Sequence, residues 1–121
     1  MCIRDSDEIV DVPTNYSLPT ANTIYSANGT LLATSFADML DGSIAVSLAA
    51  AGMPLLNGWH SFSGTGTANG TLDNAANCNA GTDGTAGVFG RYGADSGAGV
   101  LWMSFTQAAC NSSRQLLCVC F

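Results

Sequence analysis

Lysine is absent from this sequence, and only Arg4, Arg91 and Arg114 supply positive side-chain charge. Charged residues make up 10% of the chain, against roughly 25% in an ordinary globular domain. The net charge is −6, and no basic residues cluster in the sequence. A surface of this kind lacks the positive patches that bind a phosphate backbone or an anionic membrane. We therefore expect no nucleic acid among the partners of this protein.

Long apolar segments are also missing. The longest apolar-leaning run, residues 44–56, is interrupted by Ser47, Gly52 and Pro54. A helix that spans a bilayer needs about 20 consecutive apolar residues. We therefore expect no membrane insertion within this chain.

The residues of a hydrolytic site are scarce. His60 is the only histidine, and no serine lies in the Gly-x-Ser-x-Gly pattern of a nucleophile elbow. We interpret His60 as a residue at the end of a strand, beside core aromatic side chains. The acids Asp73, Asp83 and Asp95 leave one alternative, a hydrolase built on loop carboxylates. Our prediction is that the chain is not an enzyme and has neither catalytic residues nor a cofactor.

Oxygen ligands for calcium are present, but in no recognised order. Carboxylates and side-chain amides are the groups that Ca²⁺ prefers, and residues 73–95 carry them at Asp73, Asn74, Asn77, Asn79, Asp83 and Asp95. Their spacing does not fit an EF-hand loop. The Glu-Pro-Asn, Gln-Pro-Asp and Trp-Asn-Asp sequences of sugar-binding lectins are missing. We predict no metal site, and calcium-dependent carbohydrate binding stays an alternative.

The first six residues, Met1 to Ser6, resemble a translated transposon-end adapter of sequencing libraries. Such a segment is left out of fold reasoning, and we expect the natural N-terminus, with any signal or anchor, to lie upstream. Without Cys2, four cysteines remain: Cys78, Cys110, Cys118 and Cys120. They lack the Cys-x-x-Cys spacing of a zinc site. Disulfides outside the cytosol are the expectation, and four free thiols in a cytosolic protein are the alternative.

The first half of the chain predicts few regular elements. Residues 7–24 predict a loosely ordered lead-in. The segment from Ser35 to Gly42 predicts a short helix, with Ser35 as its N-cap and Gly42 at its end. Residues 44–48 fit a strand or a second short helix, and residues 55–62 fit a strand.

The second half combines a long loop with strands. Residues 63–87 are almost all Gly, Thr, Asn and Ala, which predicts a loop that is unusually long for a compact domain. Further strands are predicted at residues 88–92, 100–105 and 115–121, and the last is nearly continuous in apolar character, as in a central strand. Short strands and few helices predict an α+β domain with a mainly antiparallel sheet.

A series of short blocks spans about residues 25–121. The blocks are Ala37-Asp38-Met39-Leu40-Asp41-Gly42, Phe62-Ser63-Gly64-Thr65, Asn69-Gly70-Thr71, Cys78-Asn79-Ala80-Gly81-Thr82 and Arg114-Gln115-Leu116-Leu117-Cys118, with Trp102 and Cys110 between the last two. In order and spacing they resemble an uncharacterised domain family of bacterial surface and secreted proteins, known from spirochaetes. That family has a C-type-lectin-like or endostatin-like fold. The sequence departs from its pattern at Gly81, where the family has Trp.

The resemblance implies a disulfide framework. It implies a bond between Cys78 and Cys110 that anchors the long loop. It also implies that the N-terminal part of the family's domain is missing from this chain, so that Cys118 or Cys120 lacks its native partner. We therefore expect residues 25–121 to form a C-type-lectin-like domain that is truncated at its N-terminus.

The resemblance further implies an extracellular or cell-surface location. We predict a non-catalytic binding or adhesion module whose long loop, residues 63–99, contacts an extracellular protein or glycan. Arg91, Tyr92 and Asp95 are the candidate contact residues, because aromatic side chains and arginine dominate binding surfaces. The alternative is a purely structural module of a larger surface protein.

Overall fold

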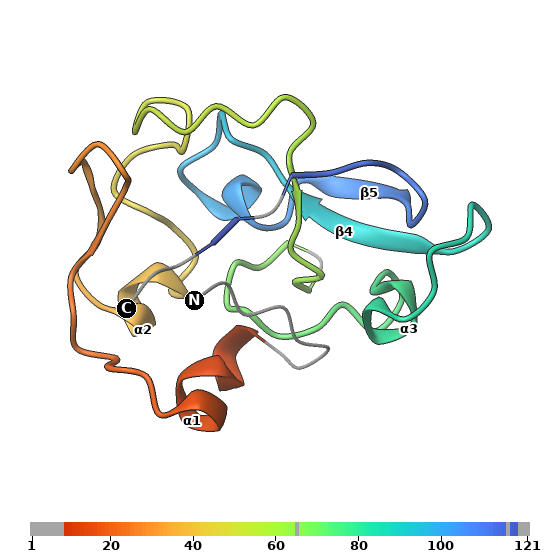
Figure 1. Cartoon of the computed structure of the whole chain (residues 1–121), viewed down its shortest axis with the longest axis horizontal. Coiled ribbons are helices and arrows are strands. Elements are labelled where there is room, and N and C mark those ends of the chain that lie inside the picture. Colours follow the sequence, from red (N-terminus) through yellow and green to blue (C-terminus); the bar gives the residue numbers. More distant parts are fainter. Residues whose placement is uncertain (1–8, 65, 116, 119–121) are drawn as a thin grey trace.

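The computed structural model describes residues 9–64, 66–115 and 117–118 of the chain (Figure 1). The strands form two antiparallel sheets, one of two strands in the order β1–β2 and one of three strands in the order β3–β4–β5. The protein is therefore a small α+β domain, as predicted. Its elements are η1 (Ile9–Asp11), α1 (Val12–Tyr16), β1 (Ile24–Tyr25), β2 (Leu31–Ala33), α2 (Phe36–Met39), β3 (Trp59–His60), α3 (Cys78–Gly81), β4 (Phe89–Gly93), η2 (Val100–Trp102) and β5 (Thr106–Ala109).

Some predictions fall outside the described residues. These are the adapter-like segment 1–6 with Cys2, and Cys120 together with most of the last predicted strand. Gln115, at the start of that predicted strand, forms a parallel bridge with Trp59. Within the part of the chain that the structure describes, no helix combines the length and the apolar character that crossing a bilayer requires.

Helix α2 forms where the sequence predicts it. Ser35 is its N-cap, and the Ser35 Oγ atom accepts a hydrogen bond from the backbone N–H of Asp38 at 3.0 Å, which satisfies one of the free donors at a helix start. The Asp38 carboxylate accepts the backbone N–H and the hydroxyl of Thr34 at 2.6 and 2.8 Å. These two hydrogen bonds lower the pKa of Asp38, and the bond from the Thr34 backbone has the larger effect. The predicted helix is confirmed, and it is one turn long.

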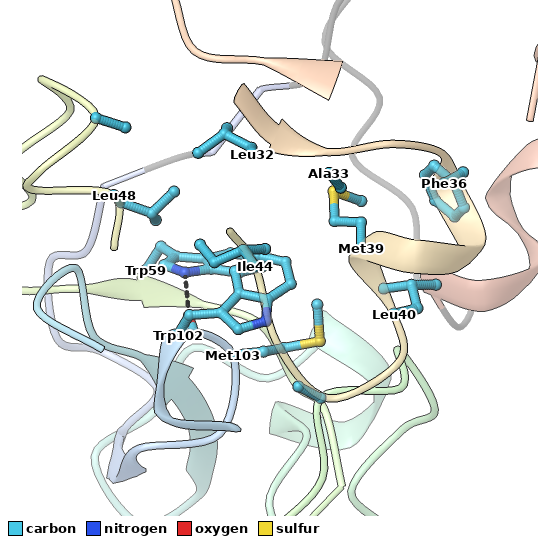
Figure 2. Close-up of a cluster of buried hydrophobic side chains, with 12 residues drawn as sticks. Leu32, Ala33, Phe36, Met39, Leu40, Ile44, Leu48, Trp59, Trp102 and Met103 are labelled. Atoms are coloured by element: carbon cyan, nitrogen blue, oxygen red, sulfur yellow. Dashed lines mark hydrogen bonds between the residues drawn. The ribbon is translucent and has the colours of Figure 1, made fainter. Parts of the chain in front are cut away.

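Two tryptophans hold the core together. The Trp59 Nε1–H group donates to the Trp102 carbonyl at 2.9 Å (Figure 2), and the two ring centroids lie 5.7 Å apart. Gly93, the strand partner of Trp59, allows this approach because a Cβ atom there would lie 1.9 Å from the Trp102 carbonyl oxygen. The buried cluster around them comprises Leu32, Ala33, Phe36, Met39, Leu40, Ile44, Leu48, Ala51, Trp59, Ala68, Trp102 and Met103.

The strand predicted at residues 100–105 is wrong. Val100–Trp102 form the 3-10 helix η2, and the last named strand, β5, begins at Thr106. The run is buried only in its middle, at Trp102, Met103 and Ser104, whereas Val100 and Leu101 before them and Phe105 after them are 37%, 45% and 48% exposed. Periodicity alone does not distinguish a run of this kind from a buried strand.

Other boundaries also differ from the prediction. Residues 44–48 form neither strand nor helix; Ile44 and Leu48 enter the core from irregular backbone, and the Ala45 N–H donates to the Leu32 carbonyl at 2.8 Å. Strand β3 covers only two residues of the predicted 55–62. The lead-in predicted at 7–24 contains the short helices η1 and α1, and Pro13 is the buried residue of its described part, 9–24.

The long loop is fastened to the larger sheet. Its helix α3 lies beside β4 (Figure 1), where Asn77 forms an antiparallel bridge with Gly90. Cys78, in α3, is bonded to Cys110, which follows β5, so the predicted disulfide is confirmed. Gly90 leaves room for this bond, because a Cβ atom there would lie 2.6 Å from the Cys78 Sγ atom.

We expect the double variant Cys78→Ala/Cys110→Ala to lose about 3.5–4 kcal/mol of unfolding free energy, because the bond closes a loop with a sequence separation of 32 and so restricts the unfolded chain. Urea unfolding of both proteins, monitored by tryptophan fluorescence, measures the difference. Reductant should lower the stability of the wild type and leave that of the variant unchanged. A loss below about 1 kcal/mol would show that the bond does not anchor the loop.

Candidate binding surface

Arg91 lies inside the domain. It is 7% exposed, and its Nε and Nη2 atoms donate to the Asp73 Oδ2 atom at 3.0 and 2.9 Å. Successive residues of a strand point to opposite faces, so Arg91 and Tyr92 do not share a surface. The structure therefore does not place Arg91 in the contact patch that the sequence predicts, because Asp73 holds its guanidinium group in the interior.

Asp73 uses its two carboxylate oxygens for different tasks. Oδ1 accepts the backbone N–H groups of Ala75 and Ala76 at 2.9 and 3.1 Å, which fixes the turn that Asp73 begins. Oδ2 holds Arg91. The backbone adds a third connection, because the Arg91 N–H donates to the Ala76 carbonyl at 2.7 Å. Loop and strand β4 are thus joined by one buried ion pair and the backbone bonds beside it.

Asp95 also has a local role. Its Oδ2 atom accepts the Leu55 N–H at 2.9 Å, and its carbonyl accepts the Ala49 N–H at 2.9 Å. These bonds tie the irregular segment 49–55 to the turn after β4. Asp95 therefore connects two backbone segments, and the structure does not bring it together with Tyr92 as a contact pair.

Tyr92 does lie at a surface, with partners that the sequence prediction does not contain. Its ring meets the ring of Phe105 edge to face, with the centroids 5.7 Å apart. The Arg114 Cζ atom lies 4.0 Å from the centroid of the Tyr92 ring, within the range of a cation–π interaction. The Arg114 Nη1 atom donates to the Asn57 carbonyl. We call Tyr92, Phe105 and Arg114 the aromatic–arginine patch.

In the described part of the chain, no carboxylate forms an ion pair with Arg114. The ion pair found there joins Arg91 and Asp73. Arg114 is half-buried, and its buried Nε atom has no hydrogen-bond partner among the described residues. Phe105 beside it is 48% exposed. The patch therefore offers a positive group and an apolar surface together, in a protein whose net charge is −6.

The remaining candidate ligands for a metal are dispersed. Hydrogen bonds from Thr85 lower the pKa of the Asp83 carboxyl group, and the bond from the Thr85 backbone N–H has the largest effect. The Asn79 side chain also donates to this carboxylate, at 3.1 Å. Asp73 and Asp95 are occupied as described above. Among the described residues, no group of three or more His, Cys, Asp or Glu side chains is placed to hold a metal ion.

His60 lies in β3, opposite Tyr92 in the strand register. Its ring stacks on Phe62, with the centroids 5.3 Å apart and the planes 13° from parallel. This is the position that the sequence analysis expects, at a strand end beside aromatic side chains.

Sequence reasoning misses Phe105 and Arg114. Phe105 belongs to an apolar run that reads as core, and nothing in the sequence says which arginine is buried. The usable signal is the dipeptide Arg91-Tyr92 itself, because only one of two neighbours in a strand can face outward. If Arg91 points to the interior, Tyr92 points outward, and an arginine beside the Tyr92 ring must come from another segment of the chain.

We expect Arg91→Met to cost about 3–5 kcal/mol of unfolding free energy, because it leaves the buried Asp73 carboxylate without its cation. Asp73→Asn keeps an oxygen for the turn and removes the charge. In a double-mutant cycle measured by urea unfolding, the combined variant should be destabilised by about 1–3 kcal/mol less than the sum of the two single variants. Additive effects would contradict the ion pair.

Comparison with protein-family models, with curated proteins and with solved structures finds no match to this chain. Function is therefore inferred from the chemistry of the aromatic–arginine patch.

Proposed function

We propose that this protein is a non-catalytic binding or adhesion module of a bacterial surface or secreted protein, with a C-type-lectin-like fold. Its contact surface is the aromatic–arginine patch of Tyr92, Phe105 and Arg114. Its partner is an extracellular protein or glycan that presents a carboxylate beside an apolar group. The purely structural module, which has no partner of its own, is the alternative that the experiment below tests.

The observation that carries this proposal is the position of Arg114. Its guanidinium group lies 4.0 Å above the Tyr92 ring and has no carboxylate partner in the described residues. Arginine and tyrosine are among the residues that contribute most to binding energy at interfaces. A guanidinium group also presents several N–H donors that match a carboxylate. The patch has the composition of a contact site for an anionic group.

The compartment in the proposal is supported by the Cys78–Cys110 disulfide. Bonds of this kind form and persist in oxidising environments such as the periplasm and the cell exterior. The fold in the proposal is supported by the α+β organisation, with a long loop that a disulfide fastens to an antiparallel sheet. The same pairing is what the resemblance to the surface-protein family implies.

The non-catalytic role is supported by the local commitments of the ionisable groups. Asp73 holds Arg91, Asp95 holds the Leu55 backbone, and His60 is stacked on Phe62. General acid–base catalysis needs a group within hydrogen-bond reach of its substrate. Each of these three side chains serves the fold instead.

We expect Arg114→Ala and Phe105→Ala each to weaken partner binding by about tenfold or more, since each removes a side chain of the patch. The measurement is biolayer interferometry against immobilised extracellular-matrix proteins and against paired neutral and carboxylated glycans. Arg114→Lys should bind more weakly than the wild type, because a lysine keeps the charge but loses the planar stack.

Phe89→Ala is the matched control. Phe89 is 47% exposed, close to the 48% of Phe105, and it lies in β4, with Ala109 of β5 as its strand partner. This control should bind within about twofold of the wild type, and thermal unfolding checks that all variants are folded. Equal affinities for all the variants would refute the patch, and binding to none of the surfaces would favour the structural module.

A further inference from the structure

A second feature lies apart from the patch, next to the core. The structure contains a cavity of about 460 Å³ between the β1–β2 hairpin, α2 and η2. Its apolar wall is made by Leu32, Phe36, Ile44, Leu48 and Trp102. In Figure 2, Leu32, Ile44 and Leu48 gather beside the Trp102 ring. The ion pair and the disulfide described above belong to other elements.

The volume is that of a ligand site. Cavities of about 150 Å³ are large enough to hold a benzene ring when their walls are apolar, and small-molecule sites usually measure about 300–1,000 Å³. A space of about 460 Å³ therefore accepts a molecule of two or three aromatic rings, or a folded aliphatic chain.

The lining determines the charge of the occupant. Among the described residues that line the cavity, none is Asp, Glu, Lys, Arg or His. Transferring an ion from water into a site without a countercharge costs far more than transferring a neutral group. The net charge of −6 adds a general repulsion of anions. The cavity therefore favours an uncharged occupant.

Two polar side chains of the lining are exposed, whereas that of Ser26 is buried. Asn22 and Thr23 are exposed and stand on the segment that leads into β1, whereas Leu48 and Trp102 are each 1% exposed. An apolar body can thus lie against the core while one hydroxyl, carbonyl or amine group reaches the amide and hydroxyl at the entrance. A few polar groups around an apolar wall are typical of small-molecule sites.

We propose that this cavity binds a small, uncharged, apolar molecule with two or three rings or an equivalent aliphatic chain. This site is separate from the aromatic–arginine patch and does not depend on the function proposed for that patch. It gives the module a second ligand of a different chemical class.

The probe is N-phenylnaphthylamine, an uncharged dye whose emission rises in apolar surroundings. We expect saturable binding to the wild type, accompanied by energy transfer from tryptophan to the dye. Trp102 lines the cavity, and the Trp59 ring lies beside that of Trp102. Anilinonaphthalene sulfonate has the same rings and one negative charge, and we expect its affinity to be lower by about tenfold or more. Equal affinity for the two dyes would overturn the proposal, as would no binding of the uncharged one.

Ile24→Phe locates the site. Ile24 is half-buried in β1 and lines the cavity, so a larger ring there fills part of the volume and should weaken binding of the uncharged dye by about tenfold. Leu56→Phe is the control, because Leu56 is 90% exposed and lies outside the lining; it should bind as the wild type does. Circular dichroism and thermal unfolding establish that both variants are folded.

Arg114→Ala separates this site from the patch. It should keep the full affinity for the uncharged dye, whatever its effect on macromolecular partners. A folded Ile24→Phe variant that binds the dye as tightly as the wild type would show that the dye binds elsewhere, and the proposal would then be abandoned.

Discussion

The ion pair between Arg91 and Asp73 is the interaction on which the rest of the structure depends. Each partner is nearly buried, with side chains 9% and 5% exposed, and a buried charge is stable only when it is paired and hydrogen-bonded. Asp73 meets this requirement with both oxygens, one toward Arg91 and one toward the turn at Ala75 and Ala76. The long loop thereby gains a fixed position, although it contributes few large apolar side chains of its own.

The same pair decides which face of β4 is available to solvent. With Arg91 directed to the loop, Tyr92 leaves the strand on the other side, where Phe105 and Arg114 meet it. One arginine thus stabilises the fold and another stays available for contact. In a chain with three Lys and Arg residues this division matters, because within the described part of the molecule Arg91 is buried and Arg114 is the positive side chain left to meet a partner.

The sequence predicts local features better than it predicts partners across the fold. The helix at Ser35 is predictable because its cap and its apolar spacing lie within a few residues, and the α+β class follows from short strand patterns. The pairing of Cys78 with Cys110 came from a resemblance to a known family and is confirmed. The strand at 100–105 fails because burial is confined to Trp102, Met103 and Ser104. The predicted role of Arg91 fails because its partner Asp73 is 18 positions away. Neither outcome is encoded in local periodicity.

Native-state hydrogen exchange tests the central claim, that the interior ion pair fixes the long loop to the sheet. The informative amides are those of Asp73 and Arg91, which donate to the Phe62 and Ala76 carbonyls at 2.7 Å each. In the wild type both should exchange as slowly as the other amides of β4, because opening the loop requires breaking the buried pair. In Arg91→Met the Asp73 amide should exchange much faster under conditions where the protein stays folded. If the Asp73 amide of the wild type already exchanges as fast as those of the exposed residues 84–87, the loop is not held by this pair and the account is wrong.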